Sequence, residues 1–240
     1  MEHDDGFSFG IGAFETMSVV KGRCVMARDH ISRLTSALED LGIARRISEQ
    51  DIAEVVSDGH LDGMVLKVEV SERNTIFSDR PNPYDDARHS RGFDLCVSDV
   101  RRNETSPFTF MKTLQYGDSI TEKRKAMSNG FDESLFLNSR GEICEGATTN
   151  IFFTDGDRIV TPPIACGLLP GTLRAYVVRN FDVTETVLRM DDLDRFDGCF
   201  VTNSLMGAMP VNSIGSICFG SRAVAETVQR TYVKDVDAGL

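Results

Sequence analysis

Apolar residues alternate with polar ones in several short segments of the chain, and this period-two pattern predicts half-buried strands. Leu66, Val68 and Val70 alternate with Lys67 and Glu69. The same reasoning predicts strands over 13–20, 93–97, 134–137 and 200–202, and hairpins that turn at 21–22 and 155–156. The chain must therefore form sheets.

Segments with helical periodicity lie between the predicted strands. The first predicted helix has Asp29 as its N-cap, Gly42 as its stop, and one apolar face made of Ile31, Leu34, Leu38 and Leu41. Further helices are predicted near 48–56 and over 118–129, 170–178 and 223–236. The mixture of the two patterns, without an internal repeat, predicts an α+β fold.

The proline-bearing polar stretch around 101–107 separates the early strands from a new series of elements. We therefore expect two domains: a smaller N-terminal domain over residues 1–104, a linker over 105–111 and a C-terminal domain over 112–240. A chain of 240 residues is long enough for this division.

The net charge of -11 comes without a basic stripe, which argues against nucleic acid and anionic membranes as partners. The N-terminus has neither the positive start nor the apolar stretch of a signal peptide, so a cytoplasmic location is expected. The six cysteines are scattered without close pairs. We expect neither disulfides nor a metal site.

Lys112 is unusual among the six lysines because it lies in an apolar setting, between the segment 108–111 and Leu114. A buried ammonium needs a specific partner or a function. Taken alone, such a lysine is more often one that extends along apolar surface to reach solvent at a strand end. Only the surrounding pattern can decide between these interpretations.

That pattern resembles the core signature of the class IV aminotransferases, enzymes of fold type IV that use pyridoxal 5′-phosphate (PLP). The matching segments are Lys112-Thr113-Leu114-Gln115, Gly130-Phe131-Asp132-Glu133 and Glu142-Ile143-Cys144-Glu145-Gly146-Ala147-Thr148-Thr149-Asn150-Ile151-Phe152. The similarity continues, in collinear order, in Phe9-Gly10-Ile11-Gly12-Ala13-Phe14-Glu15, His30-Ile31-Ser32-Arg33-Leu34, Leu168-Leu169-Pro170-Gly171-Thr172-Leu173-Arg174 and 201–211. The resemblance implies a two-domain fold with the cofactor between the domains, and a homodimer.

The resemblance assigns the chemistry to two residues. Lys112 would form the Schiff base to PLP and then move the proton between the substrate α-carbon and the cofactor. Glu145 would face the pyridine nitrogen and keep it protonated, which makes the ring an electron sink. Without the motif, Glu145 would be read as a solvated carboxylate at a strand end.

The resemblance also implies how the cofactor would be bound. Arg33, the amides of Thr172 and Leu173 at a helix N-terminus, and the Ser204 hydroxyl would hold the phosphate. Leu173 departs from the branched-chain enzymes, which usually offer a threonine hydroxyl there. The Arg33 position on the helical wheel is that of a surface arginine, so only the resemblance places it in the site. His30 is expected to be structural.

Leu169 would pack against the pyridine ring, and Tyr116 would bond its phenolic oxygen, although the offset from Lys112 is one residue short. Phe9, Phe14 and Arg80 are the candidate substrate contacts. The segments 65–71 and 203–211 look most like those of 4-amino-4-deoxychorismate lyase, which yields 4-aminobenzoate and pyruvate. An aminotransferase acting on branched-chain amino acids, D-amino acids or an amine is the alternative. Because few residues precede Phe7, a PLP-binding homologue without turnover is a third possibility.

Overall fold

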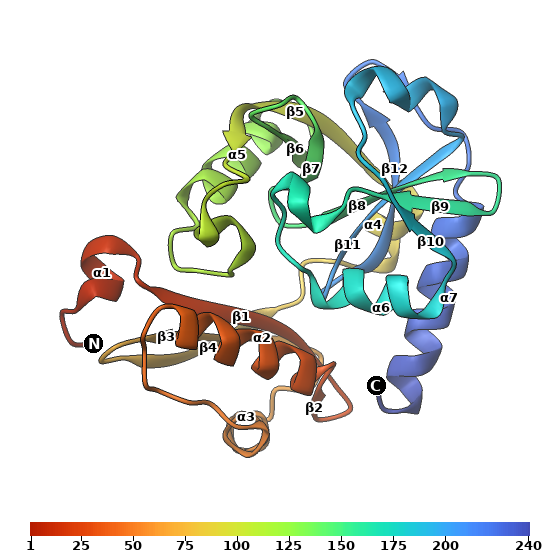
Figure 1. The fold of residues 1–240 in the computed structure, drawn as a ribbon. Coiled ribbons are helices and arrows are strands. Elements are labelled where there is room, and N and C mark those ends of the chain that lie inside the picture. The colour runs from red at the N-terminus through yellow and green to blue at the C-terminus, as the bar shows by residue number, and fades with distance from the viewer. The chain divides into compact units, whose positions relative to one another are not determined.

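A computed structural model describes all 240 residues of the chain (Figure 1). The chain divides into two compact units: unit 1 comprises residues 1–83, 111–116 and 235–240, and unit 2 comprises 84–110 and 117–234. Each unit combines a sheet with helices, so the predicted α+β class is confirmed.

Unit 1 contains a four-stranded antiparallel sheet in the order β2-β1-β3-β4. Its strands are β1 (Gly12–Val20), β2 (Arg23–Cys24), β3 (Met64–Ser71) and β4 (Thr75–Pro81). The alternation that predicted β3 separates the two faces of this sheet. The face with Leu66, Val68 and Val70 forms one core with Ala13 and Met17, while Lys67 and Glu69 lie on the opposite face.

The helices of unit 1 are α1 (Asp5–Phe9), α2 (Ala27–Asp40) and α3 (Glu49–Gly59). Leu34 and Leu38 of α2 and Ile52 and Val56 of α3 complete the core under the apolar face. The predicted stop at Gly42 agrees with its positive φ of 70°. The predicted N-cap is wrong: α2 begins two residues before Asp29, with Met26 in the left-handed conformation as its cap.

Unit 2 contains a nine-stranded mixed sheet. Its strands are β5 (Phe93–Arg102), β6 (Glu133–Asn138), β7 (Ile143–Gly146), β8 (Asn150–Asp155), β9 (Arg158–Thr161), β10 (Val183–Glu185), β11 (Gly198–Asn203), β12 (Gly207–Ile214) and β13 (Ile217–Cys218). The main order is β10-β9-β8-β11-β12-β5-β6-β7, and β7 also pairs with β8. This second pairing closes the central strands into a ring, so the sheet is barrel-like.

The helices of unit 2 are α4 (Asp86–Arg91), α5 (Gly117–Ser128), α6 (Thr172–Asn180) and α7 (Ala223–Ala238) as far as Lys234, with short 3-10 turns over Pro107–Phe110, Ile164–Cys166 and Met190–Arg195. Helix α5 contacts β5 and β6, and α6 contacts β11. The Tyr176 ring of α6 meets the Tyr232 ring of α7 edge-on, with centroids 5.4 Å apart. None of the helices is both long and apolar enough to cross a membrane.

The division into units differs from the expected domains. The expected boundary places the strand predicted at 93–97 in the N-terminal domain, but β5 is hydrogen-bonded between β12 and β6 in the sheet of unit 2. Conversely, residues 111–116, which include Lys112, belong to unit 1. Alternation shows that a segment is a strand, but it does not reveal which strands will be its neighbours.

Candidate functional site

Lys112 lies beside the edge of the unit 1 sheet. The Phe14 amide donates to the Lys112 carbonyl (2.9 Å), the Leu114 amide donates to the Gly12 carbonyl (2.9 Å), and Ala13 and Thr113 form an antiparallel bridge. Since side chains alternate along paired strands, this register puts Lys112 on the same face as Phe14. That face is opposite the one covered by α2 and α3.

The Lys112 amine is placed among aromatic rings. Its Nζ lies 4.4 Å from the centroid of Phe14 and 4.9 Å from that of Tyr116, and these two rings meet edge-on at 5.1 Å. The Tyr116 amide donates to the Leu114 carbonyl (2.8 Å), and this tight turn brings the ring back towards the amine. The structure thus brings Lys112, Tyr116 and Phe14 together despite the short offset.

A buried ion cluster lies on the opposite face of the same sheet. The Arg33 guanidinium donates from Nε and Nη2 to the two carboxylate oxygens of Glu15 (2.7 Å each), and His30 Nδ1 lies 2.7 Å from Glu15 Oε2. Burial alone would raise the pKa of the Glu15 carboxyl, but the charges and hydrogen bonds of Arg33 and His30 outweigh it and hold that pKa well below its usual range. Glu15 is therefore a carboxylate.

The Arg33 side chain is 15% exposed, so the surface position suggested by the helical wheel is wrong. The buried residues of α2 are His30, Leu34, Ala37 and Leu38, whereas Ile31 is only partly buried. The buried stripe is therefore rotated relative to the predicted one, and Arg33 lies at its edge. The bidentate contact to Glu15 fixes the orientation of the guanidinium.

In unit 2, a β-bulge directs Glu145 to one face of the sheet. Phe136 pairs with Glu145 and Leu137 pairs with Ile143, so Cys144 is the extra residue between them. Ile143 joins the main core, whereas Glu145 belongs to a row of residues that pair across neighbouring strands on the other face: Phe136, Glu145, Asn150, Thr202 and Ala208. The register thus gives Glu145 the Phe136 ring and the Asn150 amide as its direct cross-strand neighbours.

Glu145 and Asn150 hold the chain that leads into α6. The Leu169 amide donates to Glu145 Oε2 (3.0 Å), and Asn150 Nδ2 donates to the Leu169 carbonyl (2.9 Å). A Cβ atom at Gly171 would lie 2.0 Å from Asn150 Oδ1, so a side chain there would displace Asn150. This close approach explains the glycine at the N-cap of α6.

The first turn of α6 presents the predicted phosphate-binding amides. The first bond within the helix is donated by Ala175 to the Gly171 carbonyl, so the amides of Thr172 and Leu173 precede it. The Leu173 side chain is buried, which leaves only its amide for a ligand. Ser204 lies in the turn after β11, where Asn203 Oδ1 accepts hydrogen bonds from the amides of Leu205 (3.0 Å) and Met206 (3.1 Å).

Arg80 is not brought to Lys112. It pairs with Val65, which pairs with Ser18, four residues along β1 from Phe14. At about 3.3 Å per residue, this separation is about 13 Å along the strand, and Arg80 is also two strands away. Its side chain is exposed and donates to the Pro81 carbonyl (3.3 Å).

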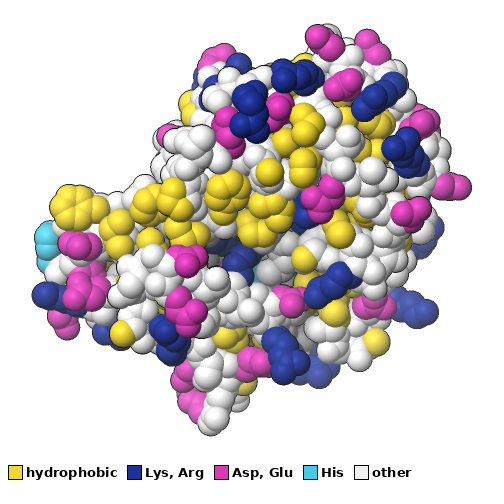
Figure 2. Space-filling view, in the orientation of Figure 1, with side chains coloured by type: hydrophobic (Ala, Val, Ile, Leu, Met, Phe, Trp, Pro, Cys, Tyr) yellow, Lys and Arg dark blue, Asp and Glu magenta, His cyan; other side chains and the backbone are white.

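Phe9 lies at the end of α1 and is 67% exposed. Gln115 Nε2 donates to the Phe9 carbonyl (3.1 Å), so the end of this helix lies next to the segment that carries Lys112. Figure 2 shows hydrophobic side chains gathered on the surface in the region of α1, and the exposed ones there include Phe7 and Phe9.

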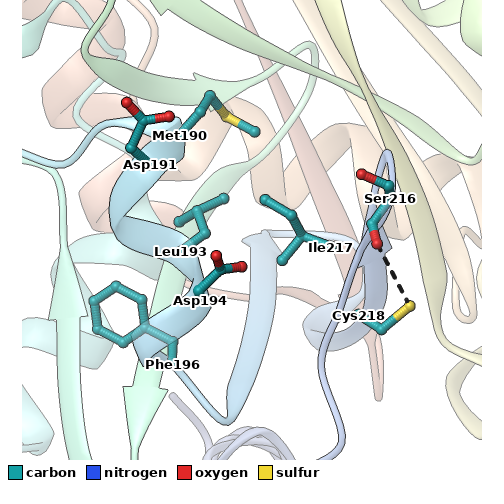
Figure 3. A pocket seen from close by; sticks show the side chains of 8 residues that line it. All are labelled: Met190, Asp191, Leu193, Asp194, Phe196, Ser216, Ile217 and Cys218. Atoms are coloured by element: carbon teal, nitrogen blue, oxygen red, sulfur yellow. Dashed lines mark hydrogen bonds between the residues drawn. The ribbon is translucent and has the colours of Figure 1, made fainter.

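A separate pocket of about 460 Å³ lies in unit 2 between the turn at 190–195 and strand β13. Figure 3 shows Met190, Leu193 and Asp194 on one side and Ile217 and Cys218 on the other. None of the predicted site residues lines it.

Sequence reasoning missed Glu15, Arg102 and Asn150 as parts of these arrangements. The sequence does contain an indication of the role of Glu15. Its side chain is on the same strand face as the core residues Ala13 and Met17, and a carboxylate buried there must be paired. The Nε atom of Arg102 lies 3.0 Å from Glu145 Oε1, and no sequence pattern indicates that contact.

Comparison with known proteins identifies a family and several relatives of this chain. The chain matches the amino-transferase class IV family over residues 12–214. It is 26% identical to the "Aminodeoxychorismate lyase" of Bacillus subtilis (strain 168), over 97% of this chain and 88% of that protein. It is 25% identical to the "Putative branched-chain-amino-acid aminotransferase" of Methanocaldococcus jannaschii, over 98% of this chain and 89% of that protein.

The fold also has close counterparts among solved structures. A "Putative 4-amino-4-deoxychorismate lyase" from Legionella pneumophila superposes with a TM-score of 0.86 and 25% identity, covering 98% of this chain and 95% of that one. The class IV aminotransferases and aminodeoxychorismate lyases are families of PLP enzymes. The resemblance seen in the sequence is thereby confirmed, and with most of its length matched, this chain belongs to the amino-transferase class IV family.

Proposed function

We propose that the protein is a PLP-dependent enzyme that acts on an amino substrate, and that its reaction is that of 4-amino-4-deoxychorismate lyase. The observation that carries the proposal is the Lys112 amine held between the Phe14 and Tyr116 rings. The lyases from Bacillus subtilis and Legionella pneumophila support the choice of reaction.

The residues present fit this cofactor. PLP needs an amine for its aldehyde, an acid for its ring nitrogen and cationic or amide donors for its phosphate. Lys112 is the amine, and Glu145 is a carboxylate fixed from both sides. Arg33 and the start of α6 provide the two kinds of donor that a phosphate dianion requires. The close approach of Gly171 to Asn150 keeps a side chain away from that helix start.

When bound, PLP supplies an electron sink that stabilises negative charge at the substrate α-carbon. The protein contributes proton transfer and orientation. Lys112 takes the proton from the α-carbon as general base; because that carbon becomes part of the aromatic ring of 4-aminobenzoate, the amine then gives a proton to the departing pyruvate unit as general acid. The ring faces beside the amine exclude water from one side of it, and the edge pairing with β1 limits where its chain can move.

Two further groups orient the cofactor in this proposal. Glu145 holds a proton on the ring nitrogen, and the main-chain contact to Leu169 keeps the carboxylate in one position. Arg33 binds the phosphate with its guanidinium, which the bidentate contact to Glu15 holds in one orientation. The Tyr116 hydroxyl is proposed to bond the phenolic oxygen, because its ring lies beside the amine.

A branched-chain aminotransferase is the second candidate. The relative from Methanocaldococcus jannaschii favours it, at an identity and coverage like those of the lyase from Bacillus subtilis. The two reactions share the proton transfer at Lys112 and differ in what leaves the site. A lyase would release pyruvate and need no amino acceptor, whereas an aminotransferase would turn over continuously only when a keto acid takes up the amino group.

This difference provides the test. Purified protein is supplied with aminodeoxychorismate or with a branched-chain amino acid, each with and without 2-oxoglutarate, while products and the cofactor spectrum are followed. The lyase gives sustained formation of 4-aminobenzoate and pyruvate without any acceptor. Turnover only in the presence of the keto acid, with no aminobenzoate, would replace the lyase by the aminotransferase. Cofactor that exchanges with no amine would indicate a homologue without turnover.

We also propose that the protein is cytoplasmic, as its N-terminal sequence suggests, and that it forms a homodimer, as its resemblance to the family suggests. Phe7 and Phe9, which are about two-thirds exposed on α1, support an apolar surface that a second copy would cover. Sedimentation equilibrium of the protein and of a Phe7→Ser, Phe9→Ser double variant measures this directly. The variant is expected to shift towards the monomer.

A further inference from the structure

Arg102, at the end of β5, is a largely buried arginine that the proposed chemistry does not use. Its side chain is 16% exposed, and its guanidinium carbon lies 3.9 Å from the centroid of the Phe136 ring. The Nη2 atom donates to the Ser119 hydroxyl (2.9 Å). Phe136 is also the cross-strand neighbour of Glu145, so the arginine lies above the row of residues that contains this carboxylate.

The contact between Arg102 and Glu145 is not one that stability alone would favour. The Nε atom is 3.0 Å from Glu145 Oε1, close enough for an ion pair, yet its buried N–H lacks hydrogen-bond geometry to any acceptor. Burying an arginine with an unsatisfied N–H is costly. Arg33, by contrast, meets Glu15 with two well-formed bonds of 2.7 Å.

Arg102 and the Leu169 amide engage different oxygens of Glu145. The guanidinium lies beside Oε1, and the amide donates to Oε2 (3.0 Å). Burial favours the neutral form of a carboxyl group, whereas an adjacent cation and a donated hydrogen bond favour the carboxylate.

We infer that Arg102 is a positioning residue that keeps Glu145 ionised and oriented, so that Glu145 can hold a proton on a pyridine nitrogen. The inference rests on the proposed function, which makes Glu145 the partner of that nitrogen. It assigns Arg102 no contact with substrate or cofactor.

The direction of the effect follows from charge separation. A proton shared by Glu145 and a ring nitrogen has two places. On the carboxyl group it leaves both groups neutral; on the nitrogen it leaves a negative charge on Glu145 and a positive charge on the ring. Two cations that bind one carboxylate lie closer to the carboxylate than to each other. The attraction of Arg102 to the negative charge therefore exceeds its repulsion of the protonated ring, and Arg102 favours the proton on the nitrogen.

The test measures that proton directly, through the ¹⁵N resonance of PLP labelled at the ring nitrogen and bound to the protein. Wild type, Glu145→Gln, Arg102→Gln and Arg102→Lys are compared, together with Arg91→Gln as the control. Arg91 also pairs with a carboxylate of unit 2, Asp132, but is half exposed and lies outside the predicted site. Thermal unfolding of each variant is recorded in parallel.

We expect Arg102→Gln to shift the ¹⁵N resonance towards that of Glu145→Gln. The shift should be more than half of the difference between wild type and Glu145→Gln. Arg102→Lys, which keeps the charge, and Arg91→Gln are expected to stay near wild type. A purely structural role would lower the unfolding temperature and leave the resonance unmoved. The inference is overturned, and the proposed function is not, if Arg102→Gln keeps the wild-type resonance. The same holds if Arg102→Lys shows the resonance of Glu145→Gln. If the wild type does not bind PLP, or Glu145→Gln leaves the resonance in place, the proposed function is overturned with it.

Discussion

Each of the two units buries a carboxylate against an arginine, and the two pairs differ in the geometry of the arginine contact. In unit 1, Glu15 receives two guanidinium bonds of 2.7 Å and a third contact of 2.7 Å from His30. In unit 2, Glu145 receives a main-chain bond of 3.0 Å and an ion pair without hydrogen-bond geometry. The first carboxylate is paired by two well-formed guanidinium bonds, and the second by an arginine whose Nε–H lacks that geometry.

This difference shows how one pair of residue types can serve two purposes. Glu15 positions Arg33, which binds an anion in the proposed function. Arg102 positions Glu145, which faces a protonated ring in the same proposal. Removing the charge of Glu15 should therefore lower the stability of the protein more than removing the charge of Glu145. The contrast can be tested on each side.

The largest effect is expected for Glu15→Gln. It leaves the buried Arg33 and His30 without their counter-charge, which we expect to cost about 3–5 kcal/mol of unfolding free energy. Glu145→Gln should cost less than about 2 kcal/mol, because it removes a single ion pair without hydrogen-bond geometry. Urea unfolding of both variants measures the difference. Equal losses would contradict the division of roles between the two carboxylates.

Arg33→Ala should weaken PLP binding by about 2–4 kcal/mol, the range expected for a charge-assisted contact to a buried dianion. Arg28→Ala is the matched control, because Arg28 belongs to the same helix but its side chain is 90% exposed. Titration of the apo-proteins with PLP gives both affinities. If the two variants bind equally well, Arg33 is not a phosphate ligand.

Acid should weaken unit 2 through Glu142. Hydrogen bonds from Arg140 and Asn138 lower the pKa of the Glu142 carboxyl from 4.5 to about 2. A lowered folded-state pKa gives stability that is fully present above about pH 4.5 and is lost as the pH falls towards 2. Glu142→Gln should therefore cost about 1–3 kcal/mol at pH 7 and progressively less in acid. Urea unfolding across pH 3–7 tests this, and a difference that grows in acid would contradict it.

A smaller effect is expected for Gly171→Ala. The new Cβ would lie 2.0 Å from Asn150 Oδ1 and would disturb the bond from Asn150 to the Leu169 carbonyl, at a cost of about 1 kcal/mol in stability. PLP affinity should fall as well, since the start of α6 would shift. Gly220→Ala is the control, because a Cβ added at Gly220 would meet no atom within 4 Å. Equal PLP affinity in both variants would remove α6 from the phosphate site.

Local elements are predictable because their signals are local. Alternation identifies β3, and the capping box that starts α3 at Ser48 has the reciprocal bonds that such a start requires. Lys112 and Glu145 can be named because their flanking motifs are continuous in the sequence. Phe14 can be named only as a candidate substrate contact; its place beside the Lys112 amine follows from the bridge between Ala13 and Thr113, which no local motif shows.

What cannot be predicted depends on register and on partners distant in the sequence. The bulge at Cys144, which turns Glu145 away from the core, is invisible in a strand of four residues. Arg102 lies 43 positions before Glu145, and nothing in its surroundings indicates that pairing. The helical wheel misplaces Arg33 because an apolar stripe through Ile31 is not the stripe that α2 buries. The position of Tyr116 requires the turn at Leu114.

The central claim is that Lys112 forms the covalent link to PLP, and trapping that link is its most direct test. The protein is incubated with PLP, reduced with borohydride and digested, and the modified peptide is identified by mass spectrometry. Lys67→Ala serves as the control, because the Lys67 ammonium also lies near the Phe14 ring, 4.8 Å from its centroid. We expect modification at Lys112 in wild type and in Lys67→Ala, and none in Lys112→Ala. Stoichiometric trapping that persists in Lys112→Ala would contradict the claim.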